Sequence, residues 1–251
     1  MNKKQKAEWL KLLEDDKNYY GDFGLKFLSY SKISTLLNNP AAFKEQSDKT
    51  VPMLIGGYLH TVILEPEKIN NFKVVEASTR NTKLYKEMSG GELCLLQHEV
   101  DKVLHLRDVL LKNDVCSNLI HGSKKTSKNI SYEIPGIAEI YGNLWKGKAD
   151  IINKNEKLII DIKTTSDVDG FRYSARKFNY DCQAYIYRQL FDLDMMFIAI
   201  DKNTHKIAIF ECSEEFYEAG QDKVMQATDM YNLFSKTEGF DPSQYFESKI
   251  L

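Results

Sequence analysis

The sequence predicts an α/β fold in which a mixed central β-sheet is flanked by helices. Apolar residues recur at helical spacing in the first half of the 251-residue chain. Runs rich in Ile, Tyr and Val follow between residues 129 and 165, separated by turn residues. A helix, two strands and a helix end the chain. Because these elements alternate without a linker or a repeat, we expect residues 1–251 to form a single domain, with residues 1–24 as a helical extension of a core over 25–235.

The first half of the chain is expected to be mainly helical. A serine cap at Ser31 predicts the start of one helix, and Pro40 ends it and opens another. Residues 72–90 are expected to be irregular. The remaining helices are predicted from apolar periodicity at residues 3–14, 51–67, 92–113 and 114–121.

The second half is expected to carry the sheet. Three β-like stretches are predicted at 129–136, 139–153 and 157–165, with NKNEK (153–157) as a hairpin connection between the last two. A helix over 176–191 and two strands around KNTH, within 195–212, should follow. Ser213 is expected to cap the last helix, with two glutamates in its first turn.

Composition narrows the classes of function. The formal net charge is −2, so any nucleic acid must meet local basic patches instead of an overall positive field. The four cysteines are far apart and none has CxxC spacing, which argues against a structural zinc site. The charged N-terminus and the absence of a long apolar run predict a cytoplasmic protein without a membrane partner.

Two carboxylates interrupt the apolar strands of the predicted hairpin. Side chains alternate along a strand, so Asp161 and Lys163 share one face, and Asp150 and Lys148 share a face of the preceding strand, opposite Ala149 and Ile151. Pairing through the hairpin places Asp150 near Asp161. Two such carboxylates repel, and a divalent cation between them removes that cost. Oxygen ligands suit Mg²⁺ or Mn²⁺.

Other side chains can join this group. Lys163 can orient or deprotonate a water, or stabilise a phosphate oxygen. Gln183 and Tyr187 lie at i and i+4 on one helix face. His60 follows Gly56 and Gly57, which we expect to permit close backbone approach, so that a ring nitrogen reaches the metal. Each residue also has an ordinary reading as a salt bridge, a core histidine or a packing side chain. Glu133 is read either as a further acidic group near the metal or, with slight preference, as a strand-edge carboxylate.

Taken together, these motifs resemble the PD-(D/E)xK nuclease superfamily, and within it the RecE-type exonucleases (exodeoxyribonuclease VIII) of phages and prophages. The motifs are G-x-x-H (Gly57 to His60), GKAD ending at Asp150, DIK (Asp161 to Lys163) and Q-x-x-x-Y (Gln183 to Tyr187). The resemblance implies a restriction-endonuclease-like core and one or two Mg²⁺ or Mn²⁺ ions per site. The ions would be held by four groups, namely His60, Asp150, Asp161 and the main-chain carbonyl of Ile162.

The resemblance also implies a function. It is hydrolysis of linear double-stranded DNA from its ends, 5′ to 3′, which leaves 3′ single strands for recombination by a RecT-like annealing protein. A ring-shaped homo-oligomer is implied. Two alternatives stay open, an end-independent endonuclease and a catalytically inactive DNA-binding protein. The candidate phosphate-binding residues are Lys124, Lys125, Lys128, Lys148, Arg172, Arg176 and Lys177, each of which is otherwise an ordinary solvated side chain.

Overall fold

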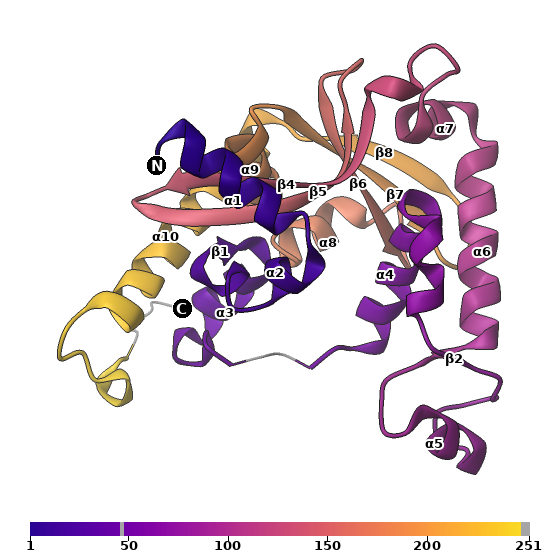
Figure 1. Ribbon diagram of the computed structural model, residues 1–251, viewed down its shortest axis with the longest axis horizontal. Coiled ribbons are helices and arrows are strands. Elements are labelled where there is room, and N and C mark those ends of the chain that lie inside the picture. Colours follow the sequence, from indigo (N-terminus) through magenta and orange to yellow (C-terminus); the bar gives the residue numbers. More distant parts are fainter. Residues whose placement is uncertain (46–47, 247–251) are drawn as a thin grey trace.

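The computed structural model describes residues 1–45 and 48–246 and confirms the mixed α/β architecture, with helices on both sides of a central sheet (Figure 1). Within these residues six strands form the sheet in the order β1-β5-β6-β7-β8, and β4 pairs with β5 outside this path. β1 pairs in parallel with β5, and β6 with β7, while the other pairs are antiparallel. The strands are β1 (Leu28–Ser29), β4 (Ile130–Ile140), β5 (Asn143–Asn153), β6 (Leu158–Thr165), β7 (Asp194–Asp201) and β8 (Ile207–Glu211).

One edge of strand β5 pairs with two different strands, β1 at one end and β6 at the other, and we call the gap between them the fork. Along the other edge it pairs with β4 over almost its whole length. On the forked edge β1 pairs only with Trp145 and Lys146, and β6 pairs only with residues 151–153. Residues 147–150, the GKAD motif, lie between these two partners. The fork therefore leaves main-chain groups and side chains of this short segment available for a site.

Two apolar cores cover the two faces of the sheet. One contains Ile159 and Phe197 and is closed by α3 (Ile33–Asn38), α8 (Phe171–Lys177), α9 (Tyr180–Phe191) and α10 (Glu214–Lys236). The other contains Ile160 and Ile162 and is closed by α4 (Val51–Leu64), α6 (Gln97–Lys112) and α7 (Asp114–His121). Adjacent residues of β6 therefore point into different cores, which confirms the period of two read from this strand.

The N-terminal segment packs on the outer part of the sheet. Helix α1 (Lys3–Leu13) crosses in front of the β4–β5 hairpin in Figure 1, and α2 (Asp16–Tyr20) follows it in the chain. Leu13, Tyr19 and Phe27 form a third apolar cluster with Ile137 of β4. The extension is thus attached to the hairpin that carries the GKAD motif.

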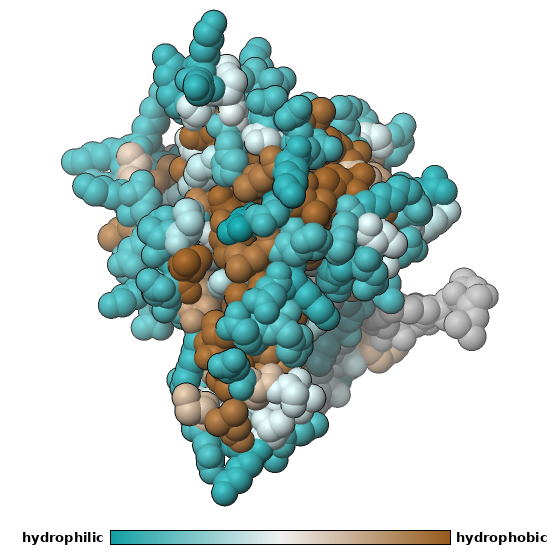
Figure 2. All heavy atoms as spheres, turned by 90° about the vertical axis from the view of Figure 1, so that its right-hand side faces the viewer, coloured by the Kyte–Doolittle hydropathy of each residue, from teal (hydrophilic) through white to brown (hydrophobic). Residues whose placement is uncertain are grey.

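Residues 72–96 form a small lobe, and the expectations for this region were wrong in two respects. Residues 72–90 are not irregular throughout, because they contain β2 (Val74–Val75) and α5 (Lys83–Ser89). The helix expected from residue 92 begins at Gln97, since β3 (Leu95–Leu96) pairs with β2 instead. Figure 2 shows hydrophobic residues exposed between hydrophilic ones down the face that carries α6 and this lobe. Leu84 and Met88 are exposed on α5.

Other boundaries differ in ways that have local causes. Tyr141 and Gly142 both have positive φ and form a two-residue turn, so one predicted strand is divided between β4 and β5. Ser31 does not cap a helix: it lies in a 3₁₀ turn, and α3 starts at Ile33. Pro40 does end α3 and opens a 3₁₀ turn. Ser213 caps α10 by accepting a hydrogen bond from the Phe216 amide, as predicted.

A membrane-spanning helix is not found in the described part of the chain, where every helix is too short or too polar to cross a bilayer.

Candidate metal centre

The fork in β5 brings together a histidine, a carboxylate and a main-chain carbonyl. His60 projects from the middle of α4, and its Nδ1 lies 3.2 Å from Oδ2 of Asp150. Its Nε2 lies 2.7 Å from the carbonyl oxygen of Ile162 on β6. Because a carbonyl can only accept, Nε2 carries a proton and donates it to this oxygen. The imidazole therefore connects two of the groups that were predicted to bind metal.

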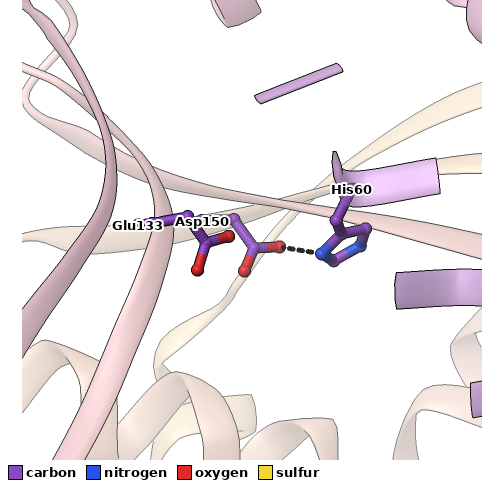
Figure 3. A group of neighbouring side chains, drawn as sticks. All are labelled: His60, Glu133 and Asp150. Carbon is purple, nitrogen blue, oxygen red and sulfur yellow. Dashed lines mark ion pairs between the residues drawn. The ribbon is translucent and has the colours of Figure 1, made fainter. Parts of the chain in front are cut away.

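Glu133 completes this cluster from the neighbouring strand. In the β4–β5 register it stands opposite Asp150, and its φ of 51° interrupts regular pairing at that point. One ligand atom from each of His60, Glu133 and Asp150 lies within 4.8 Å of the others. Figure 3 shows the two carboxylates side by side with the imidazole facing Asp150. Glu133 lies on β4, which among the described strands pairs only with β5, and its closeness to Asp150 and His60 favours the alternative reading of a further acidic group near the metal.

Asp161 is held by other partners. Ile151 of β5 pairs with Ile160 of β6, and this is the last pair of the two strands. Continuing the same register by one residue places Asp161 opposite Asp150. Its side chain is buried, and Gln183 Nε2 donates to its Oδ1 at 2.5 Å. Lys163 Nζ lies 2.8 Å from its Oδ2. The closest ligand cluster among the described residues thus contains Glu133 where the sequence predicted Asp161.

Lys163 lies between a carboxylate and an aromatic ring. Its ammonium faces Asp161 on one side and the Tyr180 ring on the other, with 4.7 Å to the ring centroid. Burial is the largest single influence on the pKa of Lys163 and lowers it, but Asp161, Tyr180 and Asp150 together outweigh burial and the pKa ends above its usual value. Lys163 is therefore a fixed positive charge at the site.

Helix α9 supports the site from the sheet face that carries Asp161. Gln183 and Tyr187 are both buried on it, and the Tyr187 hydroxyl donates to the Lys148 carbonyl at 3.0 Å. This bond satisfies a main-chain acceptor in the forked segment. A Cβ at Gly147 would come within 2.8 Å of the Tyr187 ring, so the glycine of GKAD is needed for the helix to lie this close.

The acidic groups of the cluster retain protons unusually well. Burial raises the pKa of Asp150 to about 6, the nearby imidazole opposes this, and Asp161 adds to it. Burial and the charge of Asp150 raise the pKa of Glu133 to about 8. Burial lowers the pKa of His60, but the charges of Asp150 and Asp161 raise it above its usual value. The carboxylates of Asp150 and Glu133 therefore repel each other when both are ionised, and the imidazole of His60, when protonated, offsets part of this repulsion.

The donor set fits a divalent metal ion. Two carboxylates, an imidazole nitrogen and a carbonyl oxygen are ligands that Mn²⁺ accepts, and the oxygen groups suit Mg²⁺. Oδ2 of Asp150 is buried without a hydrogen bond within the described residues, and so is Oε1 of Gln183. Buried acceptors of this kind are costly unless an ion, a water or a substrate satisfies them.

Some expectations about side-chain placement were wrong. Ala149 and Ile151 were expected to share a face, but they pack into different cores, so the alternation of β5 slips at Asp150. Gly56 and Gly57 were expected to permit close approach, yet a Cβ at either position would meet nothing within 4 Å. Gly57 is exposed one turn before His60, and the space that a side chain would occupy there is open.

Of the seven predicted DNA-binding residues, six are exposed and one is largely buried. Lys148 is the exception, because its side chain is only 9% exposed and its ammonium pairs with Asp16. The others are exposed: Lys124, Lys125 and Lys128 lie in the segment between α7 and β4, and Arg172, Arg176 and Lys177 lie on α8. Their role in binding stays a prediction.

Comparison with known proteins gives a family and a fold. The model of a family described as "PDDEXK-like domain of unknown function (DUF3799)" matches residues 29–244. A solved structure of a candidate exonuclease from Eubacterium rectale is similar over 94% of this chain and 95% of its own, with a TM-score of 0.63 and 14% identity. A phage-related exonuclease from Haemophilus somnus 129PT is similar with a TM-score of 0.35 and 18% identity. The match covers 84% of this chain and 97% of that one. No curated protein matches the chain in sequence.

Proposed function

The chain belongs to the PDDEXK-like domain family, and from this premise we propose that it is a metal-dependent deoxyribonuclease. The observation that carries the proposal is the fork in β5. There His60, Glu133 and Asp150 converge within 4.8 Å. The Asp161–Lys163 pair stands on the adjacent strand. Carboxylates beside a fixed ammonium are suited to phosphodiester hydrolysis, which needs both a cation site and a positive charge for the phosphate.

The residues of the site have separate roles in this proposal. His60, Asp150, Glu133 and the Ile162 carbonyl would hold a Mg²⁺ or Mn²⁺ ion, with Asp161 beside them. When bound, such an ion polarises a phosphoryl oxygen and makes water a stronger acid. The raised pKa of Lys163 favours a role as an ammonium that orients a water or neutralises a phosphate oxygen.

Two residues of α9 position this machinery. Gln183 Nε2 fixes one oxygen of Asp161, and its own Oε1 has no partner in the described residues. Tyr187 fixes the strand backbone next to Asp150. Removing either side chain should displace a carboxylate by a fraction of an ångström, which is enough to reduce turnover strongly.

For the substrate we propose linear double-stranded DNA, digested 5′ to 3′ to leave 3′ single strands. Support comes from the RecE-type motifs and from the similarity in fold to a candidate exonuclease. A RecT-like annealing protein and a ring-shaped homo-oligomer belong to the same proposal. The exposed cations of α8 and of the segment before β4 would contact phosphates without reading sequence.

The test is incubation of the protein with end-labelled linear duplex and Mg²⁺. We expect mononucleotide release from the 5′ label before the 3′ label, and no release by Asp161→Ala. Closed circular duplex is the matched substrate, and its cleavage would favour an endonuclease. Binding of duplex without cleavage of either substrate would favour an inactive DNA-binding protein.

A further inference from the structure

We propose that Tyr20 is a stacking platform for a nucleobase of the DNA bound at the metal centre. The inference rests on the proposed function and adds a substrate contact from outside the family match. That match begins at residue 29, whereas Tyr20 ends α2 in the N-terminal segment. Three features carry the argument, namely the attachment of α2 to the forked strand, the exposure of the Tyr20 ring and its closeness to the metal centre.

The attachment is made by two lysines of β5. Lys146 is buried, donates to the Tyr19 carbonyl oxygen and lies 4.1 Å from the centroid of the Tyr19 ring. Lys148 pairs with Asp16 and lies 4.6 Å from the same centroid. Both ammonium groups thus reach from the GKAD strand into α2 and fix this short helix beside the strand that carries Asp150.

Tyr19 and Tyr20 are adjacent but differ sharply in exposure. Tyr19 is 8% exposed, whereas Tyr20 is 72% exposed. The Tyr20 ring is oriented by an edge contact with Tyr19, with centroids 5.0 Å apart, and Lys148 Nζ lies 5.6 Å from its centroid. The ring is therefore held from one side while most of its surface is open to solvent. A preorganised open ring loses little entropy when a planar group stacks on it.

The ring also lies at the edge of the metal centre. Three carboxylates, those of Glu133, Asp16 and Asp150, are close enough to the Tyr20 hydroxyl to act on its ionisation. Two of these three are members of the metal cluster. Lys148 also links the Tyr20 ring to the metal centre. Its ammonium contacts the ring, and it precedes Asp150 by two residues on the same strand.

A nucleobase is the occupant that this location favours. A phosphate held at the centre brings its own base close to the rim, and every base has a π-face that stacks on tyrosine without sequence preference. Lys148 stays paired with Asp16, so the contact is mainly aromatic and not ionic. An apolar side chain of a protein partner is the alternative occupant, and the experiment separates the two.

The experiment measures binding of a short duplex with 2-aminopurine at its terminal position, with Ca²⁺ in place of Mg²⁺. The variants are Tyr20→Ala, Tyr20→Phe and Tyr20→Trp, with Leu25→Ala as a control because Leu25 is 64% exposed in the same segment. We expect the wild type, the two aromatic variants and the control to quench the terminal fluorophore. Tyr20→Ala should lose the quenching and bind about tenfold more weakly, with unchanged circular dichroism.

Three results would overturn the inference. If Tyr20→Ala quenches and binds as the wild type does, the ring does not stack on DNA, while the nuclease proposal stands. If Tyr20→Phe is as weak as Tyr20→Ala, the hydroxyl makes the contact and stacking is rejected. If the wild type binds no duplex at all, both this inference and the proposed function fail.

Discussion

Replacement of Glu133 by glutamine should stabilise the metal-free protein and weaken its metal binding. The carboxyl is half-buried beside Asp150 and His60, and its pKa of about 8 is well above its ordinary 4.5. A group whose folded pKa is raised holds its proton longer in the native state than in the unfolded state. The free energy of unfolding therefore falls as pH rises from about 4.5 to about 8. Glutamine cannot ionise, so the variant avoids this loss.

The size of the effect follows from the two pKa values. The difference corresponds to at most about 3 kcal/mol at pH 7. Solvent reaches the carboxyl, which reduces this to about 1 kcal/mol. For a chain of this length that free energy raises Tm by about 2–4 °C. The gain should be small near pH 5, which is only just above the ordinary pKa of 4.5, and largest at pH 8.

The assay is thermal unfolding at pH 5 and pH 8, with and without Mn²⁺. The matched control is Glu139→Gln, since Glu139 is an exposed carboxylate on the same strand. At pH 8 we expect Glu133→Gln to melt higher than the wild type without metal and to gain less on adding Mn²⁺. A tenfold loss of affinity removes about 1.4 kcal/mol of metal-induced stabilisation. Equal melting temperatures and equal metal-induced shifts in Glu133→Gln and wild type would refute the reasoning.

Four further predictions concern the same site. Metal affinity should rise between about pH 6 and pH 8, because Asp150 and Glu133 must lose protons to bind a cation; calorimetry at pH 5.5, 7 and 8.5 measures this, and a flat profile would contradict it. Lys163→Ala should bind Mn²⁺ with at least wild-type affinity but cleave DNA at least a hundredfold more slowly, so lost metal binding would count against its assigned role. Tyr180→Leu should slow cleavage about tenfold while Tyr180→Phe does not, since the ring face holds Lys163; equal rates in both variants would remove the ring from the account. Gly57→Leu should keep its fold and Mn²⁺ binding, because a Cβ there meets nothing within 4 Å, yet lose affinity for DNA; wild-type cleavage would show that the open space beside His60 is not on the substrate path.

Much of the fold could be predicted from local pattern. Alternation placed Ile160 and Ile162 of β6 in one core and Ile159 in the other. Ser213 and its two following glutamates located the start of α10. The lobe at 72–96 could not be predicted, because β2 and β3 are two-residue strands that exist only through pairing with each other. Leu95 and Leu96 continue the apolar periodicity of α6, so sequence alone extends that helix too far.

The closeness of Glu133 to Asp150 was not predicted, although a signal for it was present in the sequence. Tyr141–Gly142 is a two-residue turn, and counting back from it pairs Glu133 with Asp150. That turn was read as part of a continuous strand, so the register was lost. The positive φ of Glu133, which disturbs pairing at the site, has no marker in the sequence. Likewise, nothing local indicates that Lys148 contacts Asp16, which is far away in the chain.

The most direct test of the account is calorimetric titration of Mn²⁺ into the wild type, His60→Ala and Asp150→Asn. These two side chains, on α4 and β5, face each other across 3.2 Å and are the centre of the proposed ligand set. The account predicts saturable binding by the wild type and at least tenfold weaker binding by each variant. Equal affinity in all three proteins would mean that the cluster at the fork is not the metal site.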